Sequence, residues 1–328
     1  MWLTIQTKFL GMVLCAIAAI IASLVATRYQ APVMLFALLL GLALHAFYRN
    51  KKVQAGVNFC SRELLRFCVG LLGVRIAFAD IVALGIAPPL IVMVSMGLTI
   101  LLGVLLARIL ALPKTFGVLS GGAVAVCGVS AAAAIATVLP KDKAQEKYFA
   151  MTVIGITTFS TLSMIFYPLL ASYLGFSDQL AGVFLGGAIH DVAQVIGAGY
   201  TVSHEAGDVA TYIKLLRVAL LMPIVMMVFF AFKEKDSKMS GGVSAFIPGF
   251  LIMFFVLALL KNLGLIPLWL IEFIRSLSSH LLVVAIAAIG VKTSLKQVLS
   301  LGWRPVVLMA SETLILAGLI ITALMVFY

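Results

Sequence analysis

The chain has 328 residues, of which 63% are hydrophobic and 11% are charged, and its mean hydropathy is +1.20. This composition predicts an all-α polytopic membrane protein in a single transmembrane domain, 1–328, and leaves no stretch long enough for a soluble domain. The formal net charge of +11 comes from short clusters between apolar runs. Such clusters are typical of the cytoplasmic loops of membrane proteins, so the positive charge does not indicate nucleic-acid binding.

Nine apolar runs of about twenty residues, the length that crosses a bilayer as a helix, follow one another along the chain. They lie at 9–27, 32–48, 63–85, 88–111, 148–174, 209–232, 244–262, 267–291 and 304–327. The first run lacks the polar end of a cleaved signal peptide, so we expect it to remain as the first span. Two glycine-rich segments, 116–139 and 179–200, either cross as well or re-enter. We therefore predict about 9–11 transmembrane helices, two of the segments being interrupted or re-entrant.

The basic residues of the short loops predict the orientation. The amino terminus is expected in the cytoplasm, together with two basic clusters: Arg49, Lys51, Lys52, Arg62 and Arg66, and then Lys233, Lys235 and Lys238. The lysines of loop 140–147 favour a re-entrant segment 116–139. The acidic stretch His204 to Asp208 is expected outside.

An internal repeat is visible in the sequence. The string GVRIAFADIVALGIAP at Gly73 to Pro88 aligns without gaps to GVKTSLKQVLSLGWRP at Gly290 to Pro305. The segments that carry it cross in opposite directions, as in inverted-repeat transporters, and we place the two repeats around 9–139 and 179–328. Chance similarity of two glycine-rich apolar strings is the alternative, but the matched cation and proline favour a true repeat.

His190 and Asp191 are the most prominent polar pair at membrane depth. On a regular helix they would point about 100° apart, but beside a Gly-Gly break both could face one ligand. Such a pair indicates a proton relay or a ligand contact, because ionisable groups inside a membrane are usually functional. Gln194, one turn further, adds an amide. The alternative is a structural role, tying down backbone amides freed at the break.

The first glycine-rich string, SGGAVAVCGVS, leaves backbone amides accessible where a helix resumes, and that environment suits a small oxyanion. The alternative is close helix packing. The candidate ligand-contacting residues of the two strings are Gly121, Gly122, Cys127, Gly128, Ser130, Gly186 and Gly187.

Four cations and one acid at membrane depth are further candidates. Arg75 and Lys292 match in the repeat and either snorkel to the interface or attract anions at two mouths of a pathway. Lys214 and Arg217 share a helix face and could do the same. Glu312 either is protonated or pairs with one of these cations.

The strings AVCGVSA and GGAIHDVAQVIGAG resemble the paired signatures of the YeiH family, also called UPF0324, whose members are named sulfate exporters. The resemblance covers nearly the whole chain. It implies a bacterial inner-membrane transporter of the cation/proton antiporter and anion transporter superfamily, with interrupted core helices and a plausible homodimer. The family pattern more often has Glu after His, so Asp191 keeps the carboxylate at a shorter reach. The resemblance carries over onto the glycines, Cys127 and Ser130 given above and onto His190, Asp191 and Gln194.

We therefore expect a secondary transporter of a small anion such as sulfate, sulfite or a sulfonate, an exporter working by alternating access and coupled to protons through His190 and Asp191. The alternatives are a cation/proton antiporter of the same superfamily and an anion-binding channel or receptor. An intramembrane hydrolase with Cys127 or Ser130 as nucleophile is disfavoured, because no local string resembles a nucleophile turn. We expect no enzyme activity, no cofactor and no metal site; the expected partners are the anion, protons and the lipid bilayer.

Overall fold

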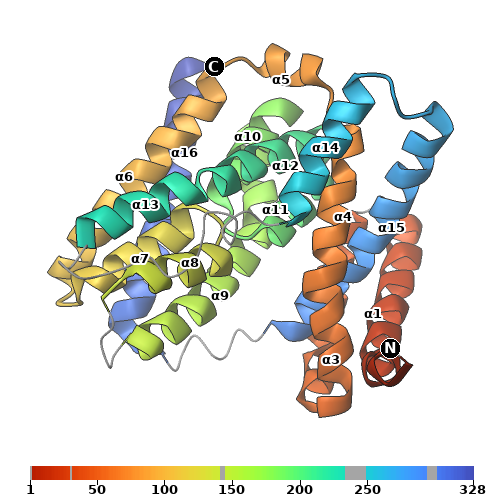
Figure 1. Cartoon of the computed structure of the whole chain (residues 1–328), viewed down its shortest axis with the longest axis horizontal. Helices are drawn as coiled ribbons and strands as arrows, with labels where there is room; N and C mark the ends of the chain where they lie inside the picture. The colour runs from red at the N-terminus through yellow and green to blue at the C-terminus, as the bar shows by residue number, and fades with distance from the viewer. Residues whose placement is uncertain (1, 30–31, 141–144, 233–248, 294–300) are drawn as a thin grey trace. The chain divides into compact units, whose positions relative to one another are not determined.

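The computed structural model describes residues 2–29, 32–140, 145–232, 249–293 and 301–328. Every regular element in these ranges is a helix (Figure 1), as the composition predicts. The chain forms two compact units, and each unit gathers three stretches of sequence. Unit 1 comprises the described residues of Met1–Ala83, Ile196–Asp208 and Pro248–Ser294, and unit 2 comprises those of Leu84–Val195, Val209–Ile247 and Leu295–Tyr328.

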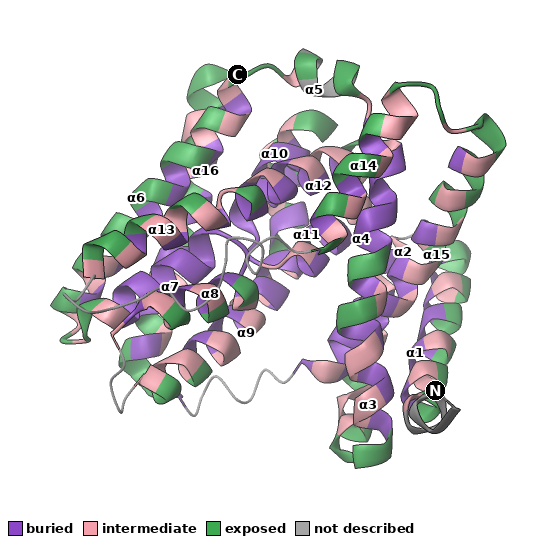
Figure 2. Cartoon of the chain, viewed as in Figure 1, coloured by how far each residue is buried: buried purple, intermediate pink, exposed green. Residues whose placement is uncertain are grey.

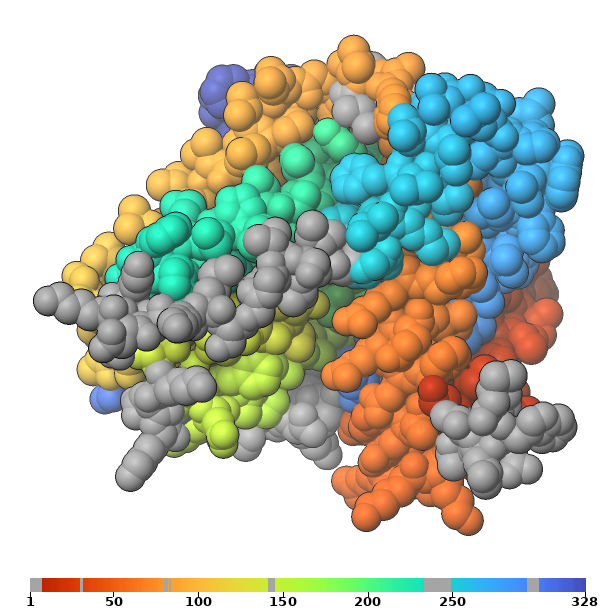
Figure 3. All heavy atoms as spheres, viewed as in Figure 1, coloured from red at the N-terminus to blue at the C-terminus, as the bar shows by residue number. Residues whose placement is uncertain are grey.

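Unit 1 packs pairs of helices that are distant in sequence: α1 with α3, α2 with α15, and α4 with α14. Helix α14 contacts α4, and in the space-filling view its cyan spheres adjoin the orange segment that contains α4 (Figure 3). The backbones of α2 and α15 approach closely at Gly41 and Gly290, where an added Cβ would overlap the facing backbone; small residues allow this approach between membrane helices. The helices of this unit are α1 (Trp2–Tyr29), α2 (Val33–Ala43), η1 (Leu44–Arg49), α3 (Lys51–Phe59), η2 (Cys60–Leu64), α4 (Leu65–Leu71), η3 (Leu72–Arg75), most of α5 (Phe78–Leu84), α14 (Gly249–Asn262) and α15 (Leu268–Lys292).

Unit 2 surrounds two short, enclosed helices, α7 and α10, whose residues 116–125 and 181–188 are all buried (Figure 2). Helix α7 packs against α6, α9 and α16, and α10 packs against α9 and α16. The helices of this unit are α6 (Ala87–Ile109), α7 (Lys114–Ala125), α8 (Val129–Val138), α9 (Gln145–Tyr173), α10 (Asp178–Ala188), α13 (Leu221–Phe232) and α16 (Trp303–Phe327). Two more, α11 (Val192–Val202) and α12 (His204–Ala219), each carry residues of both units.

Six helices of the described residues are long and apolar enough to cross a membrane: 8–29, 87–109, 145–173, 204–232, 268–292 and 303–327. They match six of the nine predicted runs. The runs at 32–48 and 63–85 are divided among shorter helices, and the described part of 244–262 is the 14-residue α14. Apolar runs alone do not show where a helix is interrupted.

Part of the predicted orientation signal lies outside the described residues. The residues concerned are Lys233, Lys235 and Lys238 and half of loop 140–147, namely residues 141–144. The cytoplasmic amino terminus therefore stays a prediction.

Candidate functional site

The first glycine-rich segment folds as two helices, α7 and α8, separated by residues 126–128. Gly128 has φ +68° and ψ −126°, a backbone conformation that an L residue rarely adopts. Its N–H donates to the carbonyl of Ala123 at 2.9 Å, which closes the end of α7. Helix α8 then begins without a side-chain cap. The glycine thus ends one helix and opens the amino terminus of the next.

The second glycine-rich segment also folds as two helices, α10 and α11, separated by residues 189–191. Here the amino terminus of the second helix is closed. Oδ1 of Asp191 accepts a hydrogen bond from the N–H of Ala193 at 3.1 Å, the contact of an N-cap residue. The N–H of Asp191 donates to the hydroxyl of Ser160 at 3.1 Å. The half-buried carboxylate therefore stabilises the start of α11.

The two breaks lie next to each other within unit 2. A Cβ built on Gly128 would stand 3.7 Å from the carbonyl oxygen of His190 and 3.8 Å from the nitrogen of Asp191. It would also stand 3.2 Å from Cγ2 of Ile156 on α9. One added methyl group would thus fill the space between the two irregular segments, so the segments lie next to each other.

Two fully buried cations hold the carboxyl ends of the two enclosed helices together. The ammonium of Lys214 donates to the carbonyls of Val126 at 2.8 Å and Ile189 at 2.9 Å. The five N–H groups of the Arg217 guanidinium make six contacts of 2.6–2.9 Å, one N–H being shared, with five carbonyls: those of Val124, Ala125, Gly186, Gly187 and Ile189. Each cation thus bonds to both interrupted segments.

The placement of these cations follows from helix electrostatics. The last carbonyls of a helix have no partner within it and form the negative end of its dipole, where a cation is stabilised. Lys214 and Arg217 are three apart on α12 and share a face, as the sequence indicated. What the sequence did not indicate is that both side chains bind helix-end carbonyls.

Helix α16 contacts both interrupted segments through two consecutive side chains. Oε1 of the fully buried Glu312 accepts a hydrogen bond from the hydroxyl of Ser120 on α7 at 2.8 Å. Thr313 donates its hydroxyl hydrogen to the carbonyl of Met309 at 2.7 Å, and its oxygen lies 2.9 Å from Nε2 of His190. Because the hydroxyl hydrogen is already used, Nε2 of His190 must be the donor.

The four glycines of the Gly-Gly pairs occupy close-packed positions. A Cβ on Gly121 would meet α6 and Glu312, and a Cβ on Gly122 would overlap Ile135. A Cβ on Gly186 would overlap the carbonyl of Ala210, and one on Gly187 would meet Ile320 and Val92. These contacts are those expected of close helix packing, while the carbonyls of Gly186 and Gly187 also bind Arg217.

The other predicted residues differ in exposure and in place. Cys127 and Gln194 are buried in unit 2, and Oε1 of Gln194 has no hydrogen-bond partner in the described part of the chain. Ser130, at the start of α8, is exposed. Arg75 and Lys292 belong to unit 1, whereas the two breaks belong to unit 2.

Three polar residues of this site were not candidates in the sequence: Ser120, Ser160 and Thr313. Each provides a hydroxyl to a candidate residue, Glu312, Asp191 and His190 respectively. The only signal for Thr313 is its place directly after Glu312 in an apolar run. Hydroxyls are common in transmembrane helices, so that signal is weak.

Comparison with known proteins gives the family. The family model described as "Conserved hypothetical protein 698" matches residues 9–309. A UPF0324 membrane protein of Chlorobaculum tepidum is 44% identical over 315 residues, covering 95% of this chain and 88% of that protein. The chain belongs to the UPF0324 family of membrane proteins. The UPF0324 membrane protein TauZ of Paracoccus denitrificans is 43% identical over 318 residues, covering 95% of this chain and 94% of TauZ.

The UPF0324 assignment confirms the resemblance found in the sequence. No solved structure matches the chain. The relatives are named as membrane proteins, which agrees with the six long apolar helices. The matches point to no catalytic family.

Proposed function

We propose that this UPF0324 protein is a secondary transporter that exports a small oxyanion, of the sulfate, sulfite or sulfonate class, across the bacterial inner membrane by alternating access. The observation that supports this most is a pair of fully buried cations, Lys214 and Arg217, which bind carbonyls of both interrupted segments. The two breaks lie next to each other, which also fits an inverted repeat, in which substrate is held where the repeats meet.

The charges around the breaks favour an anion. Lys214 and Arg217 contribute two positive charges. The two helix carboxyl ends that they bind carry about −0.5 each, and the amino ends of α8 and α11 carry about +0.5 each. The ionised carboxylate of Asp191 subtracts one charge. Counted with Lys214 and Arg217 protonated and Glu312 neutral, the sum is about +1, so the site favours a bound anion.

The two helix amino ends are not equivalent as anion ligands. From the sequence we expected accessible backbone amides where the first interrupted helix resumes. In the structure, Asp191 caps α11, whereas α8 begins after Gly128 with no side-chain cap. We therefore place the anion at the first turn of α8, where the backbone N–H groups and the exposed hydroxyl of Ser130 are donors.

Proton coupling is assigned to the His190–Asp191 pair. Nε2 of His190 donates to Thr313, so a proton arriving at the neutral ring binds Nδ1, which makes no hydrogen bond in the described residues. Protonation of His190 adds a positive charge beside the breaks and would strengthen anion binding. Protonation of Asp191 removes a negative charge there and would likewise strengthen anion binding.

One observation favours the alternative, a cation/proton antiporter. Oε2 of the buried Glu312 has no hydrogen-bond partner in the described part of the chain and could bind a cation. Among the described residues, however, no group of three or more His, Cys, Asp or Glu side chains could hold a metal ion. A dehydrated cation needs several oxygen ligands, so the anion remains the better fit.

The test is counterflow of radiolabelled sulfate and sulfite in proteoliposomes, with and without a pH gradient. We expect saturable flux that unlabelled anion on the opposite side accelerates. Lys214→Met should abolish the flux, whereas the matched control Arg108→Gln, an exposed cation on α6, should leave it unchanged. His190→Ala should remove the response to the pH gradient.

Other outcomes separate the alternatives. Flux without acceleration from the opposite side would identify a channel, and saturable binding without flux would identify a receptor. Sodium or potassium flux that Glu312→Gln abolishes, in the absence of anion flux, would identify the cation antiporter.

A further inference from the structure

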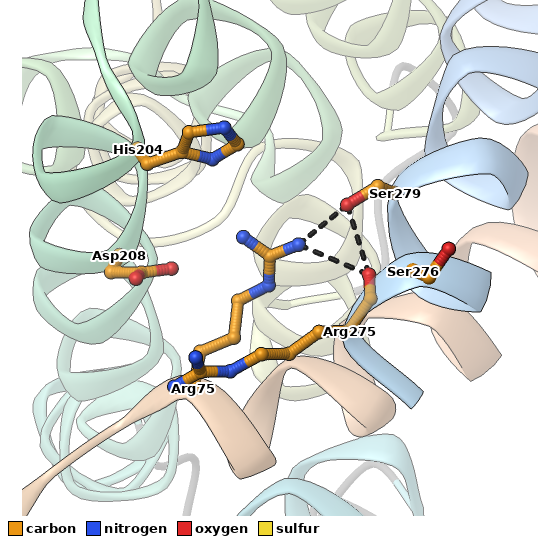
Figure 4. Close-up of a pocket in the computed structure, with 6 residues that line it drawn as sticks. All are labelled: Arg75, His204, Asp208, Arg275, Ser276 and Ser279. Carbon is orange, nitrogen blue, oxygen red and sulfur yellow. Dashed lines mark hydrogen bonds between the residues drawn. The ribbon is translucent and has the colours of Figure 1, made fainter. Parts of the chain in front are cut away.

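Unit 1 contains a polar pocket that belongs to neither break. Its volume is about 330 Å³, and it is open to the surface. Figure 4 shows its side chains converging from three elements: η3, the first two turns of α12 and the middle of α15. The residues that line it are Arg75, His204, Asp208, Arg275, Ser276 and Ser279. The volume is at the lower end of small-molecule sites, about 300–1,000 Å³.

Arg75 lies at the centre of this pocket, and not all of its N–H groups are used in hydrogen bonds within the described residues. Its NH2 donates to the hydroxyl of Ser279 at 2.5 Å and to the carbonyl of Arg275 at 3.2 Å. Its guanidinium lies 5.1 Å from the ring centre of Tyr200. Nε of Arg75 is buried and makes no hydrogen bond within the described residues. These contacts fix the position of the guanidinium and leave part of its fork unused.

The one carboxylate among the residues that line the pocket, that of Asp208, already accepts a hydrogen bond from Tyr200. Tyr200 donates its hydroxyl to Oδ1 of Asp208 at 2.5 Å. In Figure 4 the Asp208 carboxylate points toward Arg75, while the Arg275 side chain extends toward the helix that carries Arg75. Two guanidinium groups thus face one carboxylate, and His204, at the start of α12, adds a nitrogen and the positive end of a helix.

We propose that this pocket is a second oxyanion site, in which Arg75 and Arg275 bind a sulfate-like group and Asp208 weakens that binding by competing for the guanidinium groups. Arginine forks match the geometry of tetrahedral oxyanions. This inference rests on the proposed function only for the class of anion, because the transported anion is taken as the ligand.

The experiment measures equilibrium binding of radiolabelled sulfate to the full-length protein in detergent, at constant ionic strength set with chloride. Arg275→Gln should weaken binding at this site by about ten-fold to a hundred-fold, the loss expected for one charge-assisted hydrogen bond. Asp208→Asn should tighten it, because the competing charge is removed. Arg66→Gln, an exposed arginine of unit 1 outside the pocket, is the matched control.

The opposite signs separate a ligand site from a structural cluster. If Asp208 and Arg275 only stabilise unit 1, both substitutions weaken sulfate binding or both leave it unchanged, and either result overturns the proposal. Thermal unfolding of each variant is measured in parallel; Arg275→Lys keeps the charge and replaces Arg275→Gln if that variant unfolds.

The failure of this inference is distinguishable from failure of the proposed function. Sulfate flux that is saturable, together with binding that no pocket variant alters, removes the second site and leaves the transporter. Sulfate binding that responds to Asp208→Asn and Arg275→Gln with opposite signs, without flux of any anion, leaves the site and removes the transporter.

Discussion

Substitution Arg217→Met tests whether one side chain holds the two breaks together. Methionine has a similar length and no donor, so the substitution removes six hydrogen-bonding contacts without leaving a large cavity. Of the five carbonyls concerned, Ile189 keeps its bond from Lys214. The other four lose their Arg217 donor in a buried environment.

The size of the effect follows from these contacts. A buried polar group left without a partner costs about 1–3 kcal/mol, and removing one partner of a buried charged network costs about 3–5 kcal/mol. The desolvation of the guanidinium is relieved in the variant and offsets part of the loss. We therefore expect Arg217→Met to lower the free energy of unfolding by about 3–5 kcal/mol.

Lys214→Met is the internal comparison. Its two carbonyl partners are Val126 and Ile189, and Ile189 keeps its bond from Arg217. Only one carbonyl loses a donor, so we expect a smaller loss of about 1–3 kcal/mol. The exposed control Arg108→Met should change the free energy of unfolding by no more than about 0.5 kcal/mol.

The assay is unfolding by SDS in mixed micelles, followed by far-ultraviolet circular dichroism. If Arg217→Met does not accumulate, Arg217→Lys takes its place, because lysine keeps the charge and has three donors. Its free energy of unfolding is expected to lie between those of the native protein and Lys214→Met. An Arg217→Met loss no larger than that of Lys214→Met would refute the idea that stabilisation follows the number of helix-end carbonyls bound.

Three further predictions concern the breaks. Asp191→Ala should cost about 1 kcal/mol of unfolding free energy through the lost N-cap, whereas Asp191→Asn should keep the cap and remove only the response of anion flux to a pH gradient. Gly128→Ala should destabilise by about 1–3 kcal/mol because φ is positive, and Gly97→Ala, a helical position with nothing within 4 Å of the new Cβ, should stabilise by about 0.5–1 kcal/mol, both measured by the same SDS titration. Thr313→Val should destabilise by about 1–3 kcal/mol by leaving Nε2 of His190 without an acceptor, and Thr313→Ser should restore it; equal losses in the two variants would contradict the assigned hydrogen bond.

The amino-acid sequence by itself determined the class of protein and the places where its helices deviate from regularity. Long apolar runs indicate segments within a bilayer, where no water binds the backbone, so its N–H and C=O groups must form hydrogen bonds within helices. Six of the predicted runs match long helices. The strings around Gly128 and His190 identified the family. Local chemistry was sufficient here, because a Gly-Gly pair, a nearby polar dyad and hydrophobic length are all visible in a short window.

Only the tertiary structure decided what the buried ions contact. Lys214 lies 88 residues from Val126 and 25 from Ile189, the two residues whose carbonyls it binds, and Thr313 lies 123 residues from His190. No periodicity in the sequence encodes such pairs, because backbone carbonyls are the same at every position. Their availability depends on where helices end and which ends meet, and that is set by packing across the whole unit.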